Sequence, residues 1–550
     1  MFLGGLIMQD SKHRSLNKNE EASTPLSTPL GSKHLFISAF AALAAGLAAS
    51  LAAVVLMVVL RLAAGVPTPV ELFGDRVLRL LPAARFVDFL IKFGSHSKTA
   101  PLGLALLGMI GVGALLGLVY AALVRLKVPV RGYRPTLREW LMAALLTVGM
   151  TAIGTLAFWG EIGQNFLGLP IAWAMLVTVL SLLADFILYG LTLSLAYRAL
   201  LPKQPVPGVS KVSQKRRQLL ARSGVAALSV GAAAGTIGLI KGFLNNYASY
   251  DGMITPTVNG VTSPITPNSE HYVVTQNVVD PTPDINLWRL EVTGLVGQAG
   301  THSYEEIQSL PSTSRAVTLE CISNGPPGHL ISTAIWQGVT LRTLLERHGG
   351  MQPGARFVAF YSVDGYSVSL PLDEVLAVDP ILAWRMNGAE LPLRHGYPLR
   401  ALIPGRYGEE NPKWLTRVEL TDHFVGGLYA DQGWYNGPLH TISRIDRPFG
   451  RIALGHAIEI GGIAFAGNRG IQKVEVSVDN GLSWNQAKLD PPLSQDSWVL
   501  WTWQWTPLLP GNYTIVARAT DGTGQVQTSQ KQGTVPNGAT GYHSVVVQVG

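Results

Sequence analysis

The residues best suited to chemistry in this 550-residue chain lie in two short segments. Cys321 is the single cysteine and ends an apolar run, VTLEC, that is typical of a strand. One thiol forms no internal disulfide, so it is either a small buried hydrophobe, the default for a lone cysteine, or a reactive or metal-binding group. The second segment, at 392–415, places basic side chains among prolines and glycines. Those that the pattern singles out are His395, Arg400, Arg406 and Lys413.

This basic segment, PLRHGYPLRALIPGRYGEENPKWL, predicts a site for an anionic ligand. Arginine offers phosphate a planar fork of N–H donors and lysine offers a point charge, while backbone N–H groups of glycine-rich loops complete such a cradle. The alternative is that each basic side chain lies on a solvated face of the domain. Because the basic residues are interleaved with PLR, PGRYG and KWL, the anion site is the favoured interpretation.

A mixed set of elements must position these residues. From 271 to 446, strand-like runs such as RFVAFYSV alternate with helical stretches such as VTLRTLLERHG, which predicts an α+β domain. From 447 to 550, strands separated by Gly, Asn and Pro turns predict an immunoglobulin-like β-sandwich. Three tryptophans alternate at strand spacing in this last region and are expected in its core or at an interface. They are Trp501, Trp503 and Trp505.

A transmembrane bundle of about five helices is predicted for residues 34–244. The mean hydropathy of the chain is +0.26 and 14% of its residues are charged, which is unusual for a soluble protein. Long uncharged runs are typical of membrane helices, because a soluble helix keeps one polar face. Asp185, inside one run, is either a relay group or a contact to a polar neighbouring helix. The runs cover 35–60, 101–124, 140–159, 171–197 and 223–243.

The basic residues predict the orientation of this bundle. Loops at 125–138 and 198–217 are rich in Lys and Arg, whereas the loop GEIGQN has neither, so the basic loops and the tail 1–33 are expected in the cytoplasm. Five crossings then place the rest of the chain in the periplasm of an inner membrane. The net charge of +7 is thus a topology signal and no evidence for nucleic-acid binding. Residues 61–100 are expected to form an amphipathic helix pair on the membrane surface.

The fifth hydrophobic run begins with a recognisable signal. Arg216 and Arg217 precede a small, mildly hydrophobic stretch that resembles a twin-arginine export signal retained as an anchor. The alternative is two further positive-inside arginines. Twin-arginine export carries folded proteins with their cofactors, so this signal would imply a cofactor in the domain beyond. Residues 245–270, rich in Thr, Pro, Asn and Gly, are predicted to be a linker.

Long collinear segments resemble the sulfite oxidase family. CISN, then AIWQGVTLRTLL, MNGAELPLRHGYPLRALIPGRYG and KWL are similar to its molybdenum-cofactor domain, and VEVSVDNGLSW is similar to its dimerisation domain. The resemblance covers about residues 270–550. It implies that Cys321 ligates molybdenum, which is otherwise held by the dithiolene sulfurs of a molybdopterin, and a soft thiolate suits that metal.

The same resemblance implies the residues that hold the cofactor. His395, Arg400 and Lys413 stand where the family binds the pterin and its phosphate, and Arg406 belongs to the same basic segment. Further positions match cofactor-contacting positions of the family. These are Ser269, Tyr272, Val273, Asn324, Asn411 and Pro412.

The substrate side departs from the family pattern. Val273 occupies the place of a substrate-binding arginine of the sulfite-oxidising members, and Trp434 aligns with their active-site tyrosine, with Tyr435 one step away. Sulfite is therefore expected as a substrate only if another cation takes the place of this arginine in binding it. Arg406 and His329 are the candidates. His329, in GPPGHL, either approaches the metal or is an ordinary turn histidine.

The resemblance implies a molybdopterin oxidoreductase that couples oxygen-atom transfer on a small molecule to two-electron redox chemistry. The open alternatives are a cysteine-nucleophile hydrolase and a non-catalytic module that keeps the fold. No haem is predicted, because the chain has no C-x-x-C-H motif and the first four hydrophobic runs contain no histidine. An external electron partner, a cytochrome or a quinone-linked protein, is therefore expected, together with a possible homodimer through the last domain.

Overall fold

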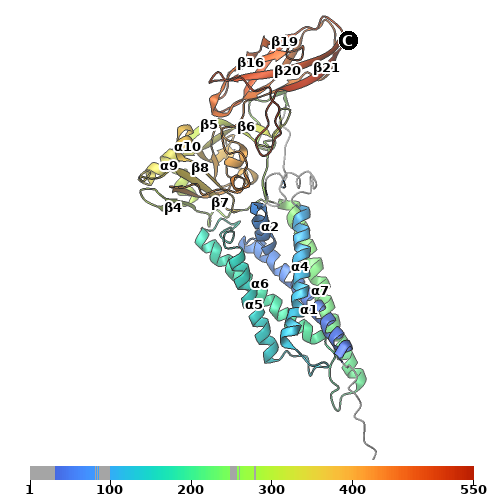
Figure 1. The fold of residues 1–550 in the computed structure, drawn as a ribbon. Helices are drawn as coiled ribbons and strands as arrows, with labels where there is room; N and C mark the ends of the chain where they lie inside the picture. Colours follow the sequence, from blue (N-terminus) through green and yellow to red (C-terminus); the bar gives the residue numbers. More distant parts are fainter. Residues whose placement is uncertain are drawn as a thin grey trace, which may run out of the picture.

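The computed structural model describes residues 31–80, 82, 85, 99–247, 257–258, 260–277 and 280–550. Three parts follow one another along a long axis (Figure 1). A helical bundle lies at one end, a β-rich part with short helices lies in the middle, and a second β-rich part carries the C-terminus at the other end.

Long apolar helices build the bundle. Five of them, within the described residues, are long and apolar enough to cross a membrane, which confirms the helices expected from the uncharged runs. They cover His34–Ala64, Gly103–Val124, Leu137–Ala157, Ile171–Leu200 and Lys211–Gly238. The full helices are α1 (Gly31–Ala64), α2 (Pro69–Leu80), α4 (Thr99–Val124), α5 (Leu137–Ala157), α6 (Ile171–Leu200) and α7 (Lys211–Tyr247).

Small residues let α1 and α4 approach closely. A Cβ added to Gly117 would lie 2.1 Å from the carbonyl oxygen of Ala42, and one added to Gly46 would lie 2.7 Å from that of Ala114. Such close contacts between small residues are typical of helix pairs that pack in a membrane. Asp185 of α6 is buried, and its Oδ1 has no hydrogen-bond partner among the described residues.

The expected amphipathic helix pair at 61–100 is seen in part. Its first half forms α2, which follows the end of α1. Glu71 of α2 forms an ion pair with Arg61 at 3.2 Å. Most of the second half, residues 81–98, lies outside the described residues.

Two sheets form the middle part. One has the strand order β4-β3-β12-β7-β8, and the other has the order β10-β9-β6-β5, with β11 also paired to β9. The strands are β3 (Leu290–Gly294), β4 (Gly300–His302), β5 (Thr313–Glu320), β6 (Ile331–Thr340), β7 (Phe357–Ser362), β8 (Ser367–Pro371), β9 (Ile381–Met386), β10 (Ala389–Glu390), β11 (Arg400–Leu402) and β12 (Leu415–Thr421). The helices are α8 (Tyr304–Gln308), α9 (Leu341–Arg347), α10 (Leu372–Val378), η2 (Leu393–His395), η3 (Gly408–Glu410) and η4 (Ala430–Gln432).

Two further sheets share one core at the C-terminal end. Their orders are β13-β15-β19-β18 and β14-β21-β20-β16-β17. Trp501 and Trp505 are buried in the common core and Trp503 packs against it, as their spacing predicted. The elements are β13 (Ile442–Arg447), β14 (Gly450–Ile452), β15 (Ile458–Phe465), η5 (Gly467–Arg469), β16 (Ile471–Ser477), β17 (Asn485–Gln486), β18 (Lys488–Leu489), β19 (Val499–Trp505), β20 (Gly511–Asp521) and β21 (His543–Val549).

Part of the segment expected to be a linker packs against both β-rich parts. It contains the hairpin of β1 (Thr257–Val258) and β2 (Val261–Thr262). The Thr262 hydroxyl lies 2.6 Å from Asp446 of β13, and the Thr266 N–H donates to Thr333 of β6 at 2.8 Å. These contacts fix the chain just before the first site residues.

A loop of the bundle docks into the middle part. Phe166 is buried in the same core as Trp288. A Cβ added to Gly168 would lie only 3.0 Å from the Trp288 side chain. The Asn165 N–H donates to the Val363 carbonyl at 3.1 Å. A loop residue of the bundle is therefore part of the hydrophobic core of the middle part, and the two parts are not joined by a tether alone.

Candidate functional site

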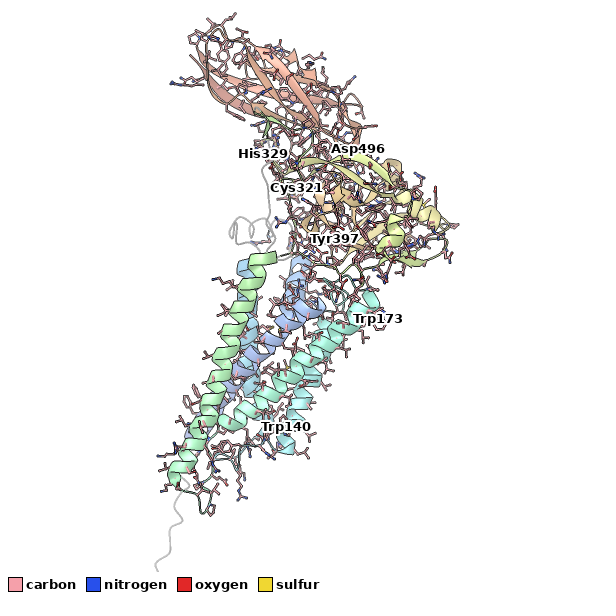
Figure 2. The ribbon with its side chains drawn as sticks, turned by 180° about the vertical axis from the view of Figure 1, so that it is seen from behind. Trp140, Trp173, Cys321, His329, Tyr397 and Asp496 are labelled. Carbon is pink, nitrogen blue, oxygen red and sulfur yellow. The ribbon has the colours of Figure 1, made fainter. Side chains whose placement is uncertain are left out.

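Cys321 lies where the antiparallel pair β5–β6 opens into a loop (Figure 2). Its N–H donates to the Leu330 carbonyl at 2.9 Å, one step beyond the last register pair of the ladder. The side chain is buried, and Sγ lies 2.9 Å from the Ser323 hydroxyl. The sheet thus fixes the position of the sulfur, while the loop leaves one side of it to other segments.

Asn324 holds this loop in shape. Its Nδ2 donates to Glu320 at 3.0 Å, and its Oδ1 accepts from the Leu330 N–H at 3.0 Å. A Cβ on Gly328 would lie 2.3 Å from Oδ1, so the turn requires glycine there. Asn324 was predicted to contact the cofactor, and in the structure its amide bonds to the loop that carries Cys321.

Two histidines, a tryptophan and an arginine from different segments meet beside this loop. The ring centroid of His271 lies 5.1 Å from that of His395 and 5.6 Å from that of Trp336, both edge to face. Arg400 lies over Trp336 with its Cζ 5.0 Å from the ring centroid. His395 Nε2 lies 3.0 Å from the Asn268 carbonyl. The predicted residues His395 and Arg400 are therefore brought together, and His271 joins them.

We call His271, His395, Arg400 and Lys413 the collar. Backbone carbonyls hold its two cations: Arg400 donates to His395 at 3.0 Å and to Asn411 at 3.2 Å, and Lys413 donates to Arg394 at 3.2 Å. Arg400 is buried, and no ion pair with it is formed in the part of the chain that the structure describes. A buried cation without a carboxylate is costly unless an anion joins it.

Burial sets the charge of the collar. It lowers the pKa of His395 to about 3 and the pKa of His271 well below its ordinary value, so both imidazoles are neutral at pH 7. It also lowers the pKa of Arg400 to about 10, which leaves the guanidinium charged. The collar therefore combines neutral hydrogen-bonding rings with fixed positive charge.

Two buried polar atoms of the collar lack a hydrogen-bond partner among the described residues. They are His271 Nε2 and Arg400 Nε. A buried polar atom left without a partner costs about 1–3 kcal/mol, so each one in a native structure calls for an explanation. An anionic group rich in oxygen and nitrogen atoms would supply these partners, and the nearby thiol would supply a soft ligand to a metal.

Tyr272 and Gly408 close the space beside Cys321. A Cβ on Gly408 would lie 2.6 Å from the Tyr272 hydroxyl and 3.7 Å from Cys321 Cα. Burial raises the pKa of Tyr272 well above its ordinary value, and the charge of Cys321 adds to this effect. The predicted residue Tyr272 therefore lies next to the thiol, at a point where only glycine fits.

Two predicted residues of the binding turn hold the backbone. Asn411 Oδ1 accepts from the Ile403 N–H at 2.6 Å, and its Nδ2 donates to the Tyr407 carbonyl at 2.7 Å. The Pro412 carbonyl accepts from the Ala401 N–H at 3.0 Å. Both residues thus fix the loop between Arg400 and Lys413.

Three other predicted residues are not part of the collar. Arg406 forms ion pairs with Glu374 and, at 3.5 Å, with Glu410, so its charge is compensated, unlike that of Arg400. Val273 is buried, whereas Ser269 is exposed.

His329 lies toward the C-terminal sheets. Figure 2 shows it on the side of Cys321 that faces them. The charges that act on it are those of Arg444 and Asp446 of β13, and it in turn acts on His543 of β21. The structure therefore associates His329 with the junction between the two β-rich parts and not with the collar.

Trp434 and Tyr435 line a narrow hollow next to the site. Trp434 is buried with its ring centroid 4.5 Å from that of Tyr429, and Tyr435 stacks on His440 at 5.3 Å. The sequence did not single out the other aromatic and acidic residues of this hollow. They are Tyr366, Tyr429, Glu409 and Glu410.

Comparisons with known proteins show what the two β-rich parts resemble. Residues 277–429 match the oxidoreductase molybdopterin binding domain, and residues 446–550 match the Mo-co oxidoreductase dimerisation domain. The chain is 28% identical over 300 residues to inducible nitrate reductase [NADH] 1 of Glycine max, which covers 44% of this chain and 34% of that protein. It is 29% identical over 314 residues to sulfite oxidase of Gallus gallus, with 48% and 68% covered.

Among solved structures, the sulfane dehydrogenase SoxCD from Paracoccus pantotrophus aligns with a TM-score of 0.47 and 21% identity, over 56% of this chain and 92% of that chain. The chain spans about a third of the nitrate reductase and about two thirds of the sulfite oxidase.

The two matched domains and these relatives define a molybdopterin-dependent oxidoreductase. The matches support a molybdenum oxidoreductase of the sulfite oxidase family, with molybdopterin as the group that its middle domain binds. The family, the enzyme class and the cofactor predicted from the sequence are thereby confirmed. The comparisons support neither the hydrolase nor the non-catalytic module.

Proposed function

We propose that this chain is a membrane-anchored oxidoreductase that transfers an oxygen atom to or from a small molecule, with its molybdenum site on the outer side of the membrane. The observation that carries the proposal is the buried thiol of Cys321 beside a collar whose Arg400 has no ion pair among the described residues. A thiolate and an uncompensated cation suit a metal and its anionic cofactor, respectively.

Each residue would have a distinct task. Cys321 would bind the metal through its thiolate, and Arg400 and Lys413 would bind the anionic end of the cofactor. His271 and His395, both neutral, would position it by hydrogen bonds. When bound, the cofactor supplies two-electron redox chemistry. Tyr272 and the loop held by Asn324 would keep the sulfur in position beside the collar.

The distribution of charge and apolar surface supports the topology. The bundle exposes large apolar side chains such as Leu104, Leu145 and Leu180, as a lipid-facing surface requires. Trp140 lies near the end of the bundle far from the β-rich parts, and Trp173 lies near the docked end (Figure 2). The basic loops belong to the far end, so the positive-inside rule would put the docked domain outside the cytoplasm.

The single cysteine makes this topology testable. In a Cys321→Ser background, Thr301→Cys would report the middle part and Arg134→Cys the basic end, since both positions are exposed. A membrane-impermeant maleimide added to intact spheroplasts should label Thr301→Cys only, and lysis should expose Arg134→Cys. Labelling of Arg134→Cys before lysis would overturn the proposed orientation.

Two partners remain proposals. An electron carrier, a cytochrome or a quinone-linked protein, would have to supply or accept electrons. The match of residues 446–550 to a dimerisation domain supports a homodimer through the C-terminal sheets.

Molybdenum content tests the proposed site directly. The full-length chain, purified in detergent from a host that makes the cofactor, should hold about one molybdenum per chain by elemental analysis. Cys321→Ser should lose the thiolate-to-molybdenum absorption band and part of the metal, because the thiolate is gone while the dithiolene sulfurs still hold the metal. Ser314→Ala, an exposed change on β5, is the matched control and should keep the metal. An unchanged absorption band in Cys321→Ser would refute the ligand assignment.

A further inference from the structure

The hollow beside the site is lined by aromatic rings, and we call it the aromatic pocket. The ring centroids of Tyr366 and Tyr429 lie 5.9 Å apart, and those of Tyr429 and Trp434 lie 4.5 Å apart. Tyr435 completes the aromatic part of the lining. The rings come from the turn after β7 and from the segment around η4, so two separate loops form the walls.

Two carboxyl groups belong to the same lining, and no Lys, Arg or His does. Glu410 is only 2% exposed, and its Oε2 has no hydrogen-bond partner among the described residues. Its Oε1 lies 3.5 Å from Arg406, outside the lining. Glu409 is the second carboxyl, and its backbone carbonyl accepts from the Tyr366 hydroxyl.

The aromatic pocket adjoins the metal-binding thiol of the proposed function. Glu409 directly follows Gly408, where an added Cβ would lie 3.7 Å from Cys321 Cα. Ile322, next in sequence to Cys321, is among the groups that act on the pKa of the Glu409 carboxyl. A molecule held among the rings would therefore lie close to the reacting centre.

This lining favours one class of ligand over another. Faces of Tyr and Trp rings attract cations, most strongly where water is excluded, and alkylammonium groups are bound by such cages. A carboxylate adds to the attraction, whereas sulfite or nitrate would meet the acidic groups without a cation in the lining. Once Glu410 is ionised, its free buried Oε2 also calls for a positively charged or donating partner.

We propose that the aromatic pocket selects substrates that carry an alkylammonium group, with tertiary amine N-oxides as the reducible members. The redox step rests on the proposed function. In it the N–O bond breaks, the amine leaves with the electron pair, and the oxygen takes up two protons and two electrons to form water. A reduced viologen would supply the two electrons in the assay.

The charge of Glu410 gives the selection a pH dependence. Burial raises the pKa of this carboxyl to about 8, so it ionises as the pH rises through that value. The affinity for a cation should therefore increase between pH 7 and pH 9, while that for a neutral molecule should not. The charged and titratable groups around it are Arg406, Glu374, Glu409, Tyr366 and Tyr435.

Calorimetric titration of the purified full-length chain with tetramethylammonium tests the selection without turnover. Binding should be saturable at pH 9 and about tenfold weaker in Glu410→Gln and in Trp434→Leu, because each removes one source of attraction. Glu305→Gln, an exposed carboxyl on α8, is the control and should bind like the parent chain. tert-Butanol, a neutral molecule of similar shape, should not compete.

Several results would overturn the inference. Binding of tetramethylammonium that is absent, or unchanged in both variants, contradicts it, as does equal competition by tert-butanol. A molybdenum-loaded enzyme that turns over sulfite or nitrate faster than trimethylamine N-oxide also contradicts it, although the proposed function then stands. A chain without molybdenum that still binds tetramethylammonium keeps the pocket assignment and refutes only the proposed redox function.

Discussion

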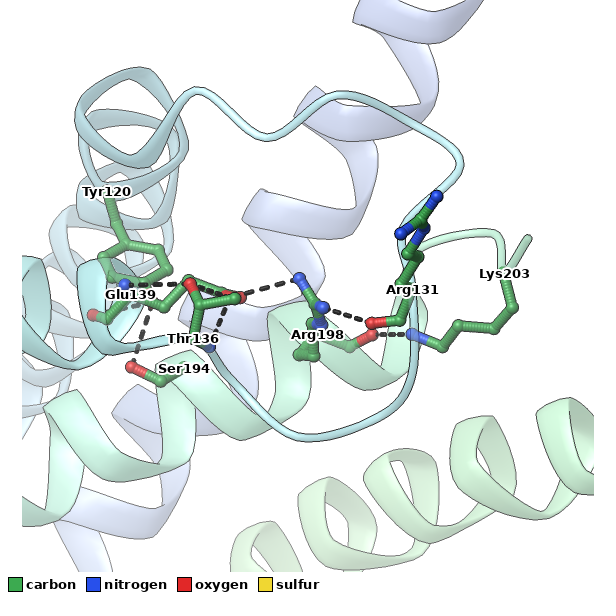
Figure 3. A network of polar contacts seen from close by, with 7 residues as sticks. All are labelled: Tyr120, Arg131, Thr136, Glu139, Ser194, Arg198 and Lys203. Carbon is green, nitrogen blue, oxygen red and sulfur yellow. Dashed lines mark hydrogen bonds and ion pairs between the residues drawn. The ribbon is translucent and has the colours of Figure 1, made fainter.

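The molecule contains two buried polar clusters whose charges are handled in opposite ways. At the far end of the bundle, Glu139 lies 3.1 Å from Arg198, and both are buried (Figure 3). In the collar, Arg400 is equally buried and pairs with no carboxylate among the described residues. In the first cluster a carboxylate pairs with the buried arginine, whereas in the second the proposed cofactor would supply the anion. Charge balance therefore separates a structural cluster from a binding site better than burial does.

The bundle cluster, shown in Figure 3, joins α5, α6 and the loops beside them. Arg198 donates to the Arg131 carbonyl as well as to Glu139, and Tyr120 lies 3.1 Å from both Ser194 Oγ and the Glu139 carbonyl. All these contacts are internal. The cluster thus joins α5 and α6 at the far end of the bundle and pairs its buried arginine with a buried carboxylate.

The largest expected effect is the loss of Glu139. Glu139→Leu would leave Arg198 buried without its carboxylate, and breaking such a pair costs about 3–5 kcal/mol of unfolding free energy. Thermal and chemical unfolding of the detergent-solubilised chain would measure the loss. Combining it with Arg198→Met should recover most of the stability, because two apolar side chains replace a complete pair. A double variant no better than Glu139→Leu would contradict the comparison.

A smaller and different effect is expected at Arg400. Arg400→Met should weaken the binding of the cofactor about 10–100-fold and so lower the molybdenum content, as loss of a group that orients a metal site does. It should not lower the unfolding temperature of the metal-free chain, because it removes a buried charge that lacks a partner. Arg385→Met, exposed on β9, is the matched control and should change neither property. If Arg400→Met kept its metal but unfolded earlier, the collar would be structural.

The sequence predicted the parts of the site that are contiguous in the chain. Cys321 and the segment from His395 to Lys413 each carry their own pattern of prolines, glycines and charges. His271 lies far from both and reaches them because Tyr272 pairs with Ser332 of β6 through a hydrogen bond of 3.1 Å. Its place depends on tertiary packing, which no local pattern shows.

The aromatic pocket was hidden for a related reason. Glu409 and Glu410 lie between basic residues in the sequence. They therefore look like an interruption of the anion-binding segment and not like part of a second site. Tyr366 comes from another part of the chain and contacts Glu409 only in the fold. The bundle was simpler to predict, because long uncharged runs need no tertiary partner to be recognised. The packing of Phe166 into the core of the middle part, however, again depends on tertiary contacts that the sequence pattern does not show.

The smallest expected effect separates local from long-range stabilisation within the bundle cluster. Thr136 caps α5: its N–H and hydroxyl donate to Glu139 at 2.7 and 2.8 Å, and its hydroxyl accepts from the Glu139 N–H. Thr136→Ala should cost about 1 kcal/mol, the usual value of an N-cap, while the Glu139–Arg198 pair persists. Thr136→Ser keeps the hydroxyl and should restore the unfolding temperature. If Thr136→Ala lost as much unfolding free energy as Glu139→Leu, the cap, and not the ion pair, would hold the cluster together. The contrast with Arg400 would then rest on hydrogen bonds and no longer on charge.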